Sequence, residues 1–337
     1  MTETIQSKKS LPLDGTPPVG DPKAKNPLLE ENTRIQKVAK NVFCLLASAL
    51  LLGLAAAICF TIAPVCSTLL LVGSVALATL GIVIGLNRIA HRFPKCIEKT
   101  IHLVHAAVTE IFALVAVGLL YPLQGIFKEK ITPTAIDERP ILLIHGYFHN
   151  SSGWIHMMNQ LQEAGFKSIY AVSLWHPLRS IDEYVEIVQD KAREIAAETE
   201  RSDLILVGHS MGGLVASKAA LTADKSINIT DVFTLGSPLK GTPLARLGLG
   251  TNARQMQTDS EFINDLGALI LKNEKNIRFF EVASEMDAIV PKKYALLDQA
   301  KKQLVLDDIG HIGMLFSTRI SDWIIDCLRV SATASEP

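Results

Sequence analysis

The sequence predicts an α/β protein with a mostly parallel sheet and a short helical cap, preceded by an N-terminal transmembrane helical hairpin. Short apolar runs alternate with longer amphipathic segments between residues 139 and 330, and this alternation is typical of parallel strands covered by helices on both faces. Glycines and polar side chains follow several of the apolar runs. No charged residue occurs between Lys40 and Arg88, a stretch long enough for two helices that each cross a bilayer in about 20 residues.

The composition limits the classes of protein to which the chain can belong. It has 337 residues, with 33 Lys and Arg against 34 Asp and Glu, and this near-neutral balance predicts no nucleic acid partner. The hydrophobic content is 48%, and its excess lies before residue 125. Residues 1–35 are rich in Pro, Lys, Asp and Thr without apolar periodicity, so we expect a disordered tail and no cleavable signal peptide. A docking or secretion-recognition segment is the alternative.

Residues 36–100 are predicted to form the transmembrane hairpin, with spans at about 42–62 and 67–87 and a turn at Pro64. Basic residues precede the first span and follow the second, whereas the turn carries none. The positive-inside tendency therefore places both ends of the hairpin, and the domain that follows, on the cytoplasmic-facing side of a membrane. In hydropathy alone, the hairpin is similar to the bilobed hydrophobic domain of chlamydial inclusion-membrane proteins. A buried helical pair in a soluble domain is the alternative.

Residues 101–138 are expected to contain an amphipathic or interfacial helix and a linker. The apolar run 104–123 is long enough to cross a membrane, but it contains His105 and Glu110, and both of its flanks are basic. We therefore predict an interfacial or core-docking helix instead of a third span. The distinction matters because a third span would place the following domain on the opposite side of the membrane.

The run from Leu204 to Val207 predicts a buried strand, and the residues that follow it predict a sharp turn into a helix. They read G-H-S-M-G-G and place Ser210 between Gly208 and Gly212 in the pattern G-x-S-x-G, in which a serine is held in strained backbone geometry above a tightly packed helix. A serine hydroxyl is a poor nucleophile alone. Its use in catalysis needs a histidine base, an orienting carboxylate and main-chain donors for an oxyanion.

Three other segments supply these groups. A buried strand from Pro140 ends at a His-Gly pair, after which the amide of Tyr147 could join that of Met211 to form an oxyanion hole. A strand over 277–284 is followed by a loop with Asp287, the candidate carboxylate. A strand over 303–306 is followed by a loop with His311, the candidate base.

With these elements, residues 139–330 resemble the α/β-hydrolase superfamily, and within it bacterial lipases and esterases. The order Ser210, Asp287, His311 is that family's order of nucleophile, acid and histidine. The segment 235–247 resembles the place in lipases where the chain leaves the sheet to build a lid. The resemblance implies ester hydrolysis through an acyl-enzyme, without a cofactor.

Other polar residues near these motifs are weaker candidates. His209 is adjacent to the nucleophile, and neighbouring side chains on a sharp turn point apart, so we expect it to pack or hydrogen-bond. Asp307 and Asp308 are too close in sequence to the histidine to be the first choice of acid. His145 and His149 have the spacing H-x-x-x-H, but no helix places both rings on one face, and the five cysteines have no metal-ligand spacing. We therefore predict no metal site.

The substrate is predicted from the cap and the hairpin. The segment between the strands that end near Gly236 and begin near Ile277 contains an apolar set: Phe262, Ile263, Leu266, Leu269, Ile270 and Leu271. A cap with an apolar inner face would accept an acyl chain, whereas the alternative is that these residues only pack onto the core. The sequence thus predicts a membrane-anchored lipase or esterase that acts on a lipid or another hydrophobic ester. An acyltransferase or thioesterase, or a non-catalytic membrane interaction protein, remains the alternative.

Overall fold

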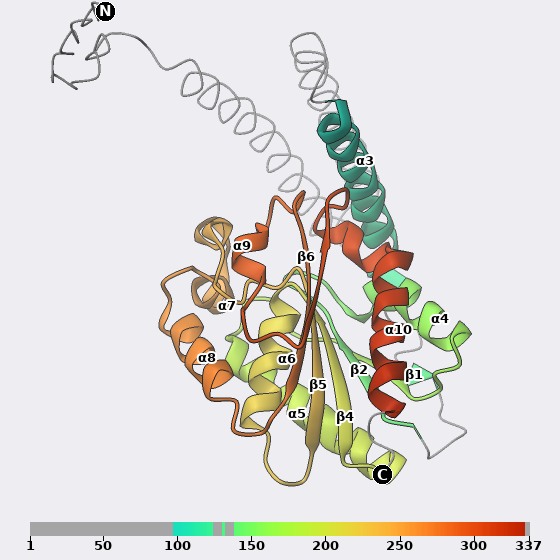
Figure 1. Ribbon diagram of the computed structural model, residues 1–337. Helices are drawn as coiled ribbons and strands as arrows, with labels where there is room; N and C mark the ends of the chain where they lie inside the picture. The colour runs from blue at the N-terminus through green and yellow to red at the C-terminus, as the bar shows by residue number, and fades with distance from the viewer. Residues whose placement is uncertain (1–96, 124–129, 132–137, 334–337) are drawn as a thin grey trace, which may run out of the picture. The chain divides into compact units, whose positions relative to one another are not determined.

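The structure is a computed structural model that describes residues 97–123, 130–131 and 138–333. The predicted tail over residues 1–35 and both predicted spans, 42–62 and 67–87, lie outside these residues, so the hairpin stays a prediction. All the helices and strands discussed below belong to the described part of the chain (Figure 1).

The described strands form one seven-stranded sheet in the order β1-β3-β2-β4-β5-β6-β7. All adjacent pairs are parallel except β1 with β3, which are antiparallel. The predicted mostly parallel sheet is therefore confirmed. The strands are β1 Lys130–Ile131, β2 Ile141–Ile144, β3 Ile169–Val172, β4 Asp203–His209, β5 Asn228–Leu235, β6 Arg278–Ser284 and β7 Lys302–Leu306.

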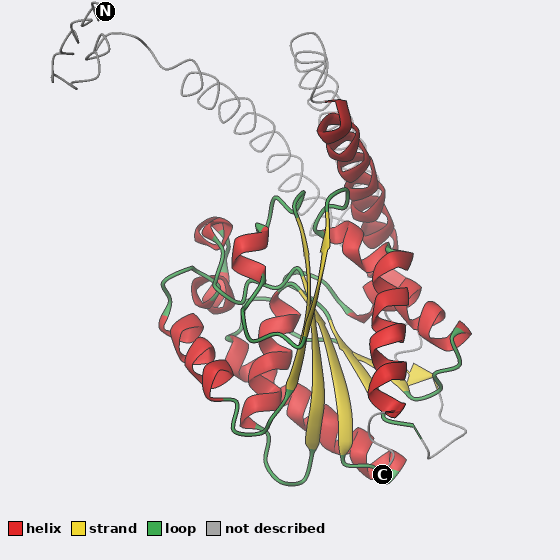
Figure 2. Ribbon diagram, viewed as in Figure 1, coloured by secondary structure: helices red, strands yellow, loops and turns green. Residues whose placement is uncertain are grey.

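Helices cover both faces of the sheet (Figure 2). The α-helices are α3 Ile97–Leu120, α4 Ile155–Glu163, α5 Ile181–Thr199, α6 Met211–Thr222, α7 Gly250–Gln255, α8 Glu261–Lys272, α9 Lys292–Ala295 and α10 Thr318–Thr333. The 3-10 helices are η2 Tyr121–Leu123, η3 Ser151–Trp154, η4 Pro243–Leu247 and η5 Ile312–Phe316. A helix that connects two parallel strands buries its apolar side on the sheet. This is the arrangement that the alternating pattern predicts.

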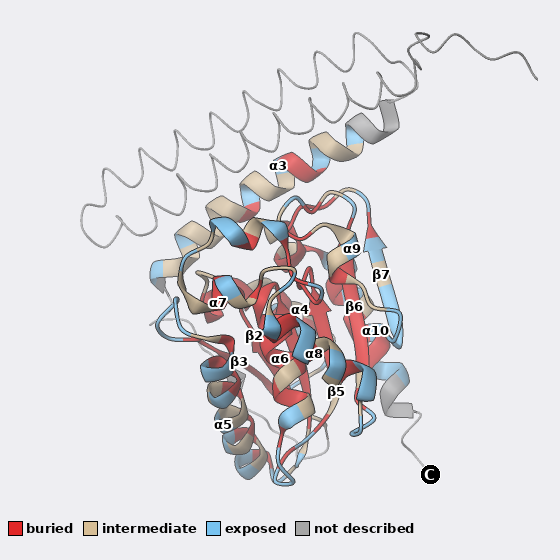
Figure 3. Ribbon diagram, turned by 90° about the vertical axis from the view of Figure 1, so that its left-hand side faces the viewer, coloured by how far each residue is buried: buried red, intermediate tan, exposed pale blue. Residues whose placement is uncertain are grey.

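The two faces of β4 show how the strands are buried. Leu204 and Leu206 pack in a core cluster with α5, α6 and α8, whereas Ile205 and Val207 pack in a second cluster with α4 and α10. Successive side chains of a strand point to opposite faces, so a run of apolar residues fills both layers at once. The central strands are buried and the edge strand β7 is largely exposed (Figure 3).

Helix α5 shows how residue type sets the start of a layer helix. Its apolar positions recur at helical spacing and are buried, and it is capped by Ser180, whose side chain accepts a hydrogen bond from the main chain of Glu183. The Glu183 carboxylate in turn accepts from the Ser180 main chain, a reciprocal pair that satisfies donors at the helix start. Helix α5 is thus one of the amphipathic segments that the alternating pattern predicts between the strands.

The segment between β5 and β6 differs from the predicted cap. Four of its six apolar residues are buried in the cluster beneath α8 with α6 and the sheet, namely Phe262, Ile263, Leu266 and Ile270. Helix α8 is therefore a layer helix, and its apolar face packs onto the core instead of facing an acyl chain. The rest of the segment between β5 and β6 contains the short helices η4 and α7. Leu247, which ends η4, and Leu249, which precedes α7, are exposed.

The region before β2 contains one unpredicted strand and one long helix. Lys130 and Ile131 lie in the predicted linker, yet they pair with β3 as strand β1. Within α3, residues Ile101–Leu120 form a helix long and apolar enough to cross a membrane. Among the described residues this single helix meets that test, and little of it is buried.

Candidate active site

Ser210 occupies a strained turn between β4 and α6. Its backbone has φ 54° and ψ −126°, a left-handed φ that costs a non-glycine residue free energy. The Ser210 amide donates to the Leu235 carbonyl at the end of β5, at 2.8 Å. A Cβ on Gly208 would lie 2.3 Å from the Gly212 carbonyl oxygen, so only glycine allows α6 to begin so close to β4. The sequence pattern therefore sets this geometry locally.

The loop after β2 passes directly beside this turn. A Cβ on Gly212 would lie 2.2 Å from a carbonyl oxygen at the end of β2, and a Cβ on Gly146 would lie 2.9 Å from the Ser210 Cβ. Tyr147 follows Gly146 in the loop, and Met211 is the first residue of α6, where main-chain N–H groups lack an intrahelical acceptor. The structure thus brings the two segments with the candidate oxyanion donors to Ser210.

Asp287 and His311 form a buried pair on the loops that follow β6 and β7. The Asp287 Oδ2 lies 2.7 Å from the His311 Nδ1, with side-chain exposures of 0% and 3%. The other carboxylate oxygen accepts hydrogen bonds from the main chain of Ile289 at 2.9 Å and of Val290 at 2.8 Å. Because the carboxylate is fixed from both sides, it directs the His311 Nδ1 proton toward itself and leaves Nε2 as the nitrogen that can accept a proton.

Two contacts place this pair next to Ser210. A Cβ on Gly236, which follows the Leu235 carbonyl that binds Ser210, would lie 3.1 Å from the Asp287 Oδ2 and 3.2 Å from the His311 Nδ1. His209, the neighbour of Ser210, donates from Nε2 to the His311 carbonyl at 3.0 Å. Within the described residues, no hydrogen bond joins the Ser210 hydroxyl to His311, and catalytic hydrogen bonds of this kind commonly tighten only with substrate bound.

The histidines of the site differ in the direction in which their pKa values are shifted. Burial lowers the pKa of His311, but the charge and hydrogen bond of Asp287 and the charge of Glu110 outweigh it, so this pKa is raised above its ordinary value. Burial and the neighbouring His311 hold the pKa of His209 well below its ordinary value. His209 is therefore neutral and takes the hydrogen-bonding role that its position predicts.

His145 and His149 support the loop after β2. Burial lowers the pKa of His145 to about 3 and that of His149 to about 4. The His145 Nδ1 lies 2.8 Å from the Gly146 carbonyl, and its Nε2 accepts from the Leu174 amide at 2.8 Å. Both ring nitrogens of His145 are thus engaged in hydrogen bonds that hold the loop. In the part of the chain that the structure describes, no three His, Cys, Asp or Glu side chains are arranged to hold a metal ion.

Glu110 lies at the site, although the sequence analysis did not predict it among the catalytic groups. Glu110 of α3 accepts hydrogen bonds from the main chain of Ile312 and Gly313, both at 2.9 Å. These residues directly follow His311. The available signal was a carboxylate in an otherwise apolar run, but the sequence does not say which loop it would contact.

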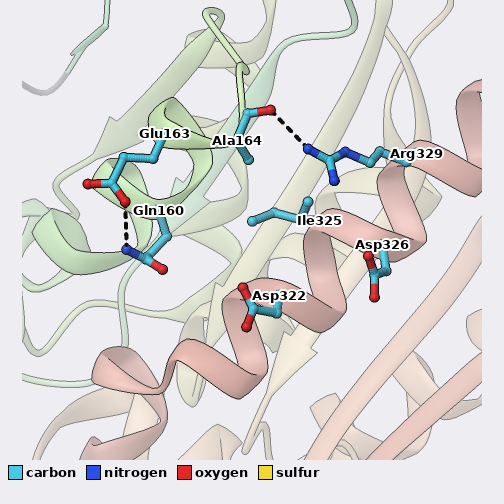
Figure 4. Close-up of a pocket in the computed structure, with 7 residues that line it drawn as sticks. All are labelled: Gln160, Glu163, Ala164, Asp322, Ile325, Asp326 and Arg329. Atoms are coloured by element: carbon cyan, nitrogen blue, oxygen red, sulfur yellow. Dashed lines mark hydrogen bonds between the residues drawn. The ribbon is translucent and has the colours of Figure 1, made fainter.

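A cavity of about 440 Å³ between α4 and α10 is separate from this site. None of the candidate catalytic residues lines it, and its wall is largely polar. In Figure 4, Gln160 bonds to Glu163 and Arg329 bonds to the Ala164 carbonyl. Since none of the candidate catalytic residues lines the cavity, we assign it no function.

The fold and this geometry define a protein with a hydrolase-type turn between a parallel strand and a helix. A model of the alpha/beta hydrolase family matches residues 141–323, and the chain belongs to that family.

Two solved lipase structures have a similar fold. The mature lipase BlEst2 of Bacillus licheniformis is 21% identical with a TM-score of 0.52, covering 58% of this chain and 94% of its own. Lipase B of Aspergillus fumigatus is 16% identical with a TM-score of 0.50, covering 60% of this chain and 56% of its own. At these identities the likeness concerns the fold.

Proposed function

We propose that the protein is a membrane-anchored serine hydrolase that cleaves carboxylic esters of lipids through an acyl-enzyme. The observation that carries the proposal is the strained Ser210 turn beside the buried Asp287–His311 pair. Membership of the alpha/beta hydrolase family and the fold shared with two lipases support a reaction of this class. The chemistry needs no cofactor.

In the proposed reaction the Ser210 hydroxyl oxygen attacks the ester carbonyl while the His311 Nε2 accepts its proton. The tetrahedral intermediate then collapses, the carbon–oxygen bond to the alcohol breaks, and His311 returns the proton to the leaving alcohol. Water repeats the sequence to release the acid and regenerate Ser210. Asp287 keeps His311 in the required tautomer and stabilises the imidazolium that forms.

The amides of Tyr147 and Met211 would bind the oxygen that becomes negative in each step. Their place beside Ser210 supports this role, because Gly146 leads one of them past the Ser210 Cβ and α6 begins with the other. Removal of one such donor typically costs about 3 kcal/mol of transition-state stabilisation. These donors would therefore account for a large part of the rate enhancement.

Exposed apolar side chains near the Tyr147 loop support a hydrophobic acyl group. Leu247 and Leu249 are exposed by 68% and 67%, and the Tyr147 hydroxyl bonds to the main chain of Leu249 at 2.7 and 2.8 Å. The main chain of Leu178, itself 45% exposed, bonds to the start of α7 at 3.0 Å. Apolar surface that stays exposed in this way favours contact with a lipid.

Membrane attachment rests on the predicted hairpin and gains support from α3. The exposed apolar side chains of α3 include Ile101, Val108, Phe112 and Leu119. A helix with such a surface favours a position at a lipid interface. We place the catalytic domain on the cytoplasmic-facing side because the basic residues flank the predicted spans.

The test is active-site labelling of the full chain in detergent micelles with a fluorophosphonate, comparing the wild type with Ser210→Ala. We expect labelling of the wild type alone, followed by hydrolysis of p-nitrophenyl esters with a preference for long acyl chains. Absence of labelling in a folded wild-type protein would refute the proposed serine hydrolase activity. A preference for acetyl or butyryl esters would refute the lipid substrate and leave a small-ester hydrolase.

A further inference from the structure

The catalytic loop is held by a second carboxylate that comes from a distant helix. The Glu110 Oε1 accepts from the Ile312 amide and its Oε2 accepts from the Gly313 amide, both at 2.9 Å. These are the first two residues of η5, and His311 is the residue that caps its N-terminus. The opening N–H groups of a helix have no intrahelical acceptor, so Glu110 satisfies donors that immediately follow the candidate base.

The loop is shaped to admit this carboxylate. A Cβ on Gly310 would lie 2.4 Å from the Glu110 Oε2 and 2.7 Å from its carboxyl carbon. Only glycine at this position leaves room for the side chain. The Glu110 carboxylate thus lies against Gly310, which precedes His311, and bonds to Ile312 and Gly313, which follow it.

The rest of α3 meets the same loop through small and polar groups. Ala106 and Ala113 are buried, and the His105 Nδ1 lies 2.8 Å from the Asp308 carbonyl. His102 lies 3.1 Å from Asp307. Glu110 is therefore one of several residues of this helix that contact the loop of His311.

The contact is also electrostatic. Burial raises the pKa of the Glu110 carboxyl above its ordinary value, whereas the hydrogen bonds from the Ile312 and Gly313 amides act in the opposite direction. The groups that face His311 are Asp287 from the loop after β6, His209 from the end of β4 and Glu110 from α3. His145 and His149 act electrostatically on His209 and contribute to its lowered pKa. When Glu110 is ionised, its charge raises the pKa of His311, so removal of this carboxylate would make His311 easier to deprotonate.

We propose that Glu110 is a positioning residue, which holds the loop of His311 from the distant helix α3 and thereby orients His311 toward Ser210. The inference rests on the proposed function. It makes the docking of α3 a condition for full activity, because the contact exists only while α3 lies on the loop. Glu110 itself would touch neither substrate nor reacting atoms.

The test compares Glu110→Gln with the wild type and with Glu163→Gln, an exposed glutamate whose carboxylate bonds to Gln160. All are purified as full chains in micelles and assayed with a p-nitrophenyl ester. Loss of a hydrogen bond to a charged group predicts a fall in kcat of about 10- to 100-fold, with KM little changed. The acid limb of the kcat/KM profile should move to lower pH. Glu163→Gln should behave as the wild type.

A second variant separates positioning from general stability. Gly310→Ala keeps Glu110 but places a methyl group where its carboxylate lies, so it should reproduce the same loss of kcat. The double variant should lose little more than either single one, because both remove one contact. A purely structural role predicts instead a lower Tm, additive losses and an unmoved acid limb. That result, or an unchanged Glu110→Gln, would overturn the positioning role.

The outcomes also separate the two proposals. If the wild type is labelled at Ser210 while Glu110→Gln keeps its full kcat, the positioning role fails and the hydrolase stands. If the wild type is not labelled at all, the proposed function fails and takes this inference with it.

Discussion

Replacement of Asp287 by Asn should disable the enzyme while leaving its fold intact. The Asp287 Oδ1 accepts from the Ile289 and Val290 amides, and Oδ2 meets the His311 Nδ1. An asparagine can keep its oxygen on the two amides, and its NH₂ group then faces Nδ1. That contact forces Nδ1 to accept and moves the ring proton to Nε2. The imidazole can then no longer take the proton of Ser210.

The expected size follows from this change of tautomer. Such a substitution in serine hydrolases lowers kcat on the order of 10⁴-fold, which corresponds to about 5.4 kcal/mol. Because the two hydrogen bonds from the main-chain amides survive and the third only reverses its direction, the free energy of unfolding should change by only about 1 kcal/mol. Activity and stability are thus expected to separate.

The assay is kcat for a p-nitrophenyl ester together with thermal unfolding by circular dichroism. Asp308→Asn is the matched control, because Asp308 follows the same strand as the base but interacts with Arg319 and His105. A variant at Asp287 that keeps more than a tenth of the wild-type kcat would show that another group orients His311. A large loss for Asp308→Asn instead would identify that group.

Three further outcomes are expected. Tyr147→Phe removes both hydroxyl bonds to the main chain of Leu249. The loss of about 1 kcal/mol of binding free energy should raise KM for long esters several-fold and leave kcat nearly unchanged. A loss confined to kcat would contradict this. Because Asp287 and Glu110 raise the pKa of His311 above 6.5, and only neutral His311 is a base, kcat/KM should fall as pH drops through a value above 6.5. A pH profile with its acid limb below 6.5 would be inconsistent with that environment. Asp231→Asn breaks the buried pairing of a carboxylate with two arginines and should destabilise the fold by about 3–5 kcal/mol in urea unfolding; a loss under 1 kcal/mol would show that the pairing contributes little.

The strands and layer helices followed from local pattern because each has a short-range physical cause. The run Leu204–Val207 was short and apolar enough to predict a strand buried on both faces, and the amphipathic segments between the apolar runs predicted helices with one face on the sheet. The weaker predictions concerned segments whose pattern fits two environments. The apolar face of residues 262–271 is as suitable for a lid as for a layer helix, and only its packing against α6 distinguished them.

At the site, the sequence was informative wherever a backbone conformation demanded a residue type. The glycines around Ser210 permit the turn, and the strands before Asp287 and His311 bring their loops to one edge of the sheet. The contact between these two side chains, and the fixing of the carboxylate by Ile289 and Val290, depend on loop geometry. That geometry has no periodic signature.

The sequence by itself determined the class of fold, the order of the candidate catalytic groups and the apolar character of the N-terminal third. These depend on composition, spacing and turn chemistry, which act over a few residues. Tertiary structure alone decided that Glu110, about 200 positions from His311, contacts the loop that carries this histidine. A contact between residues so distant in sequence arises from the way whole elements pack, and the free energy that selects it belongs to the assembled domain.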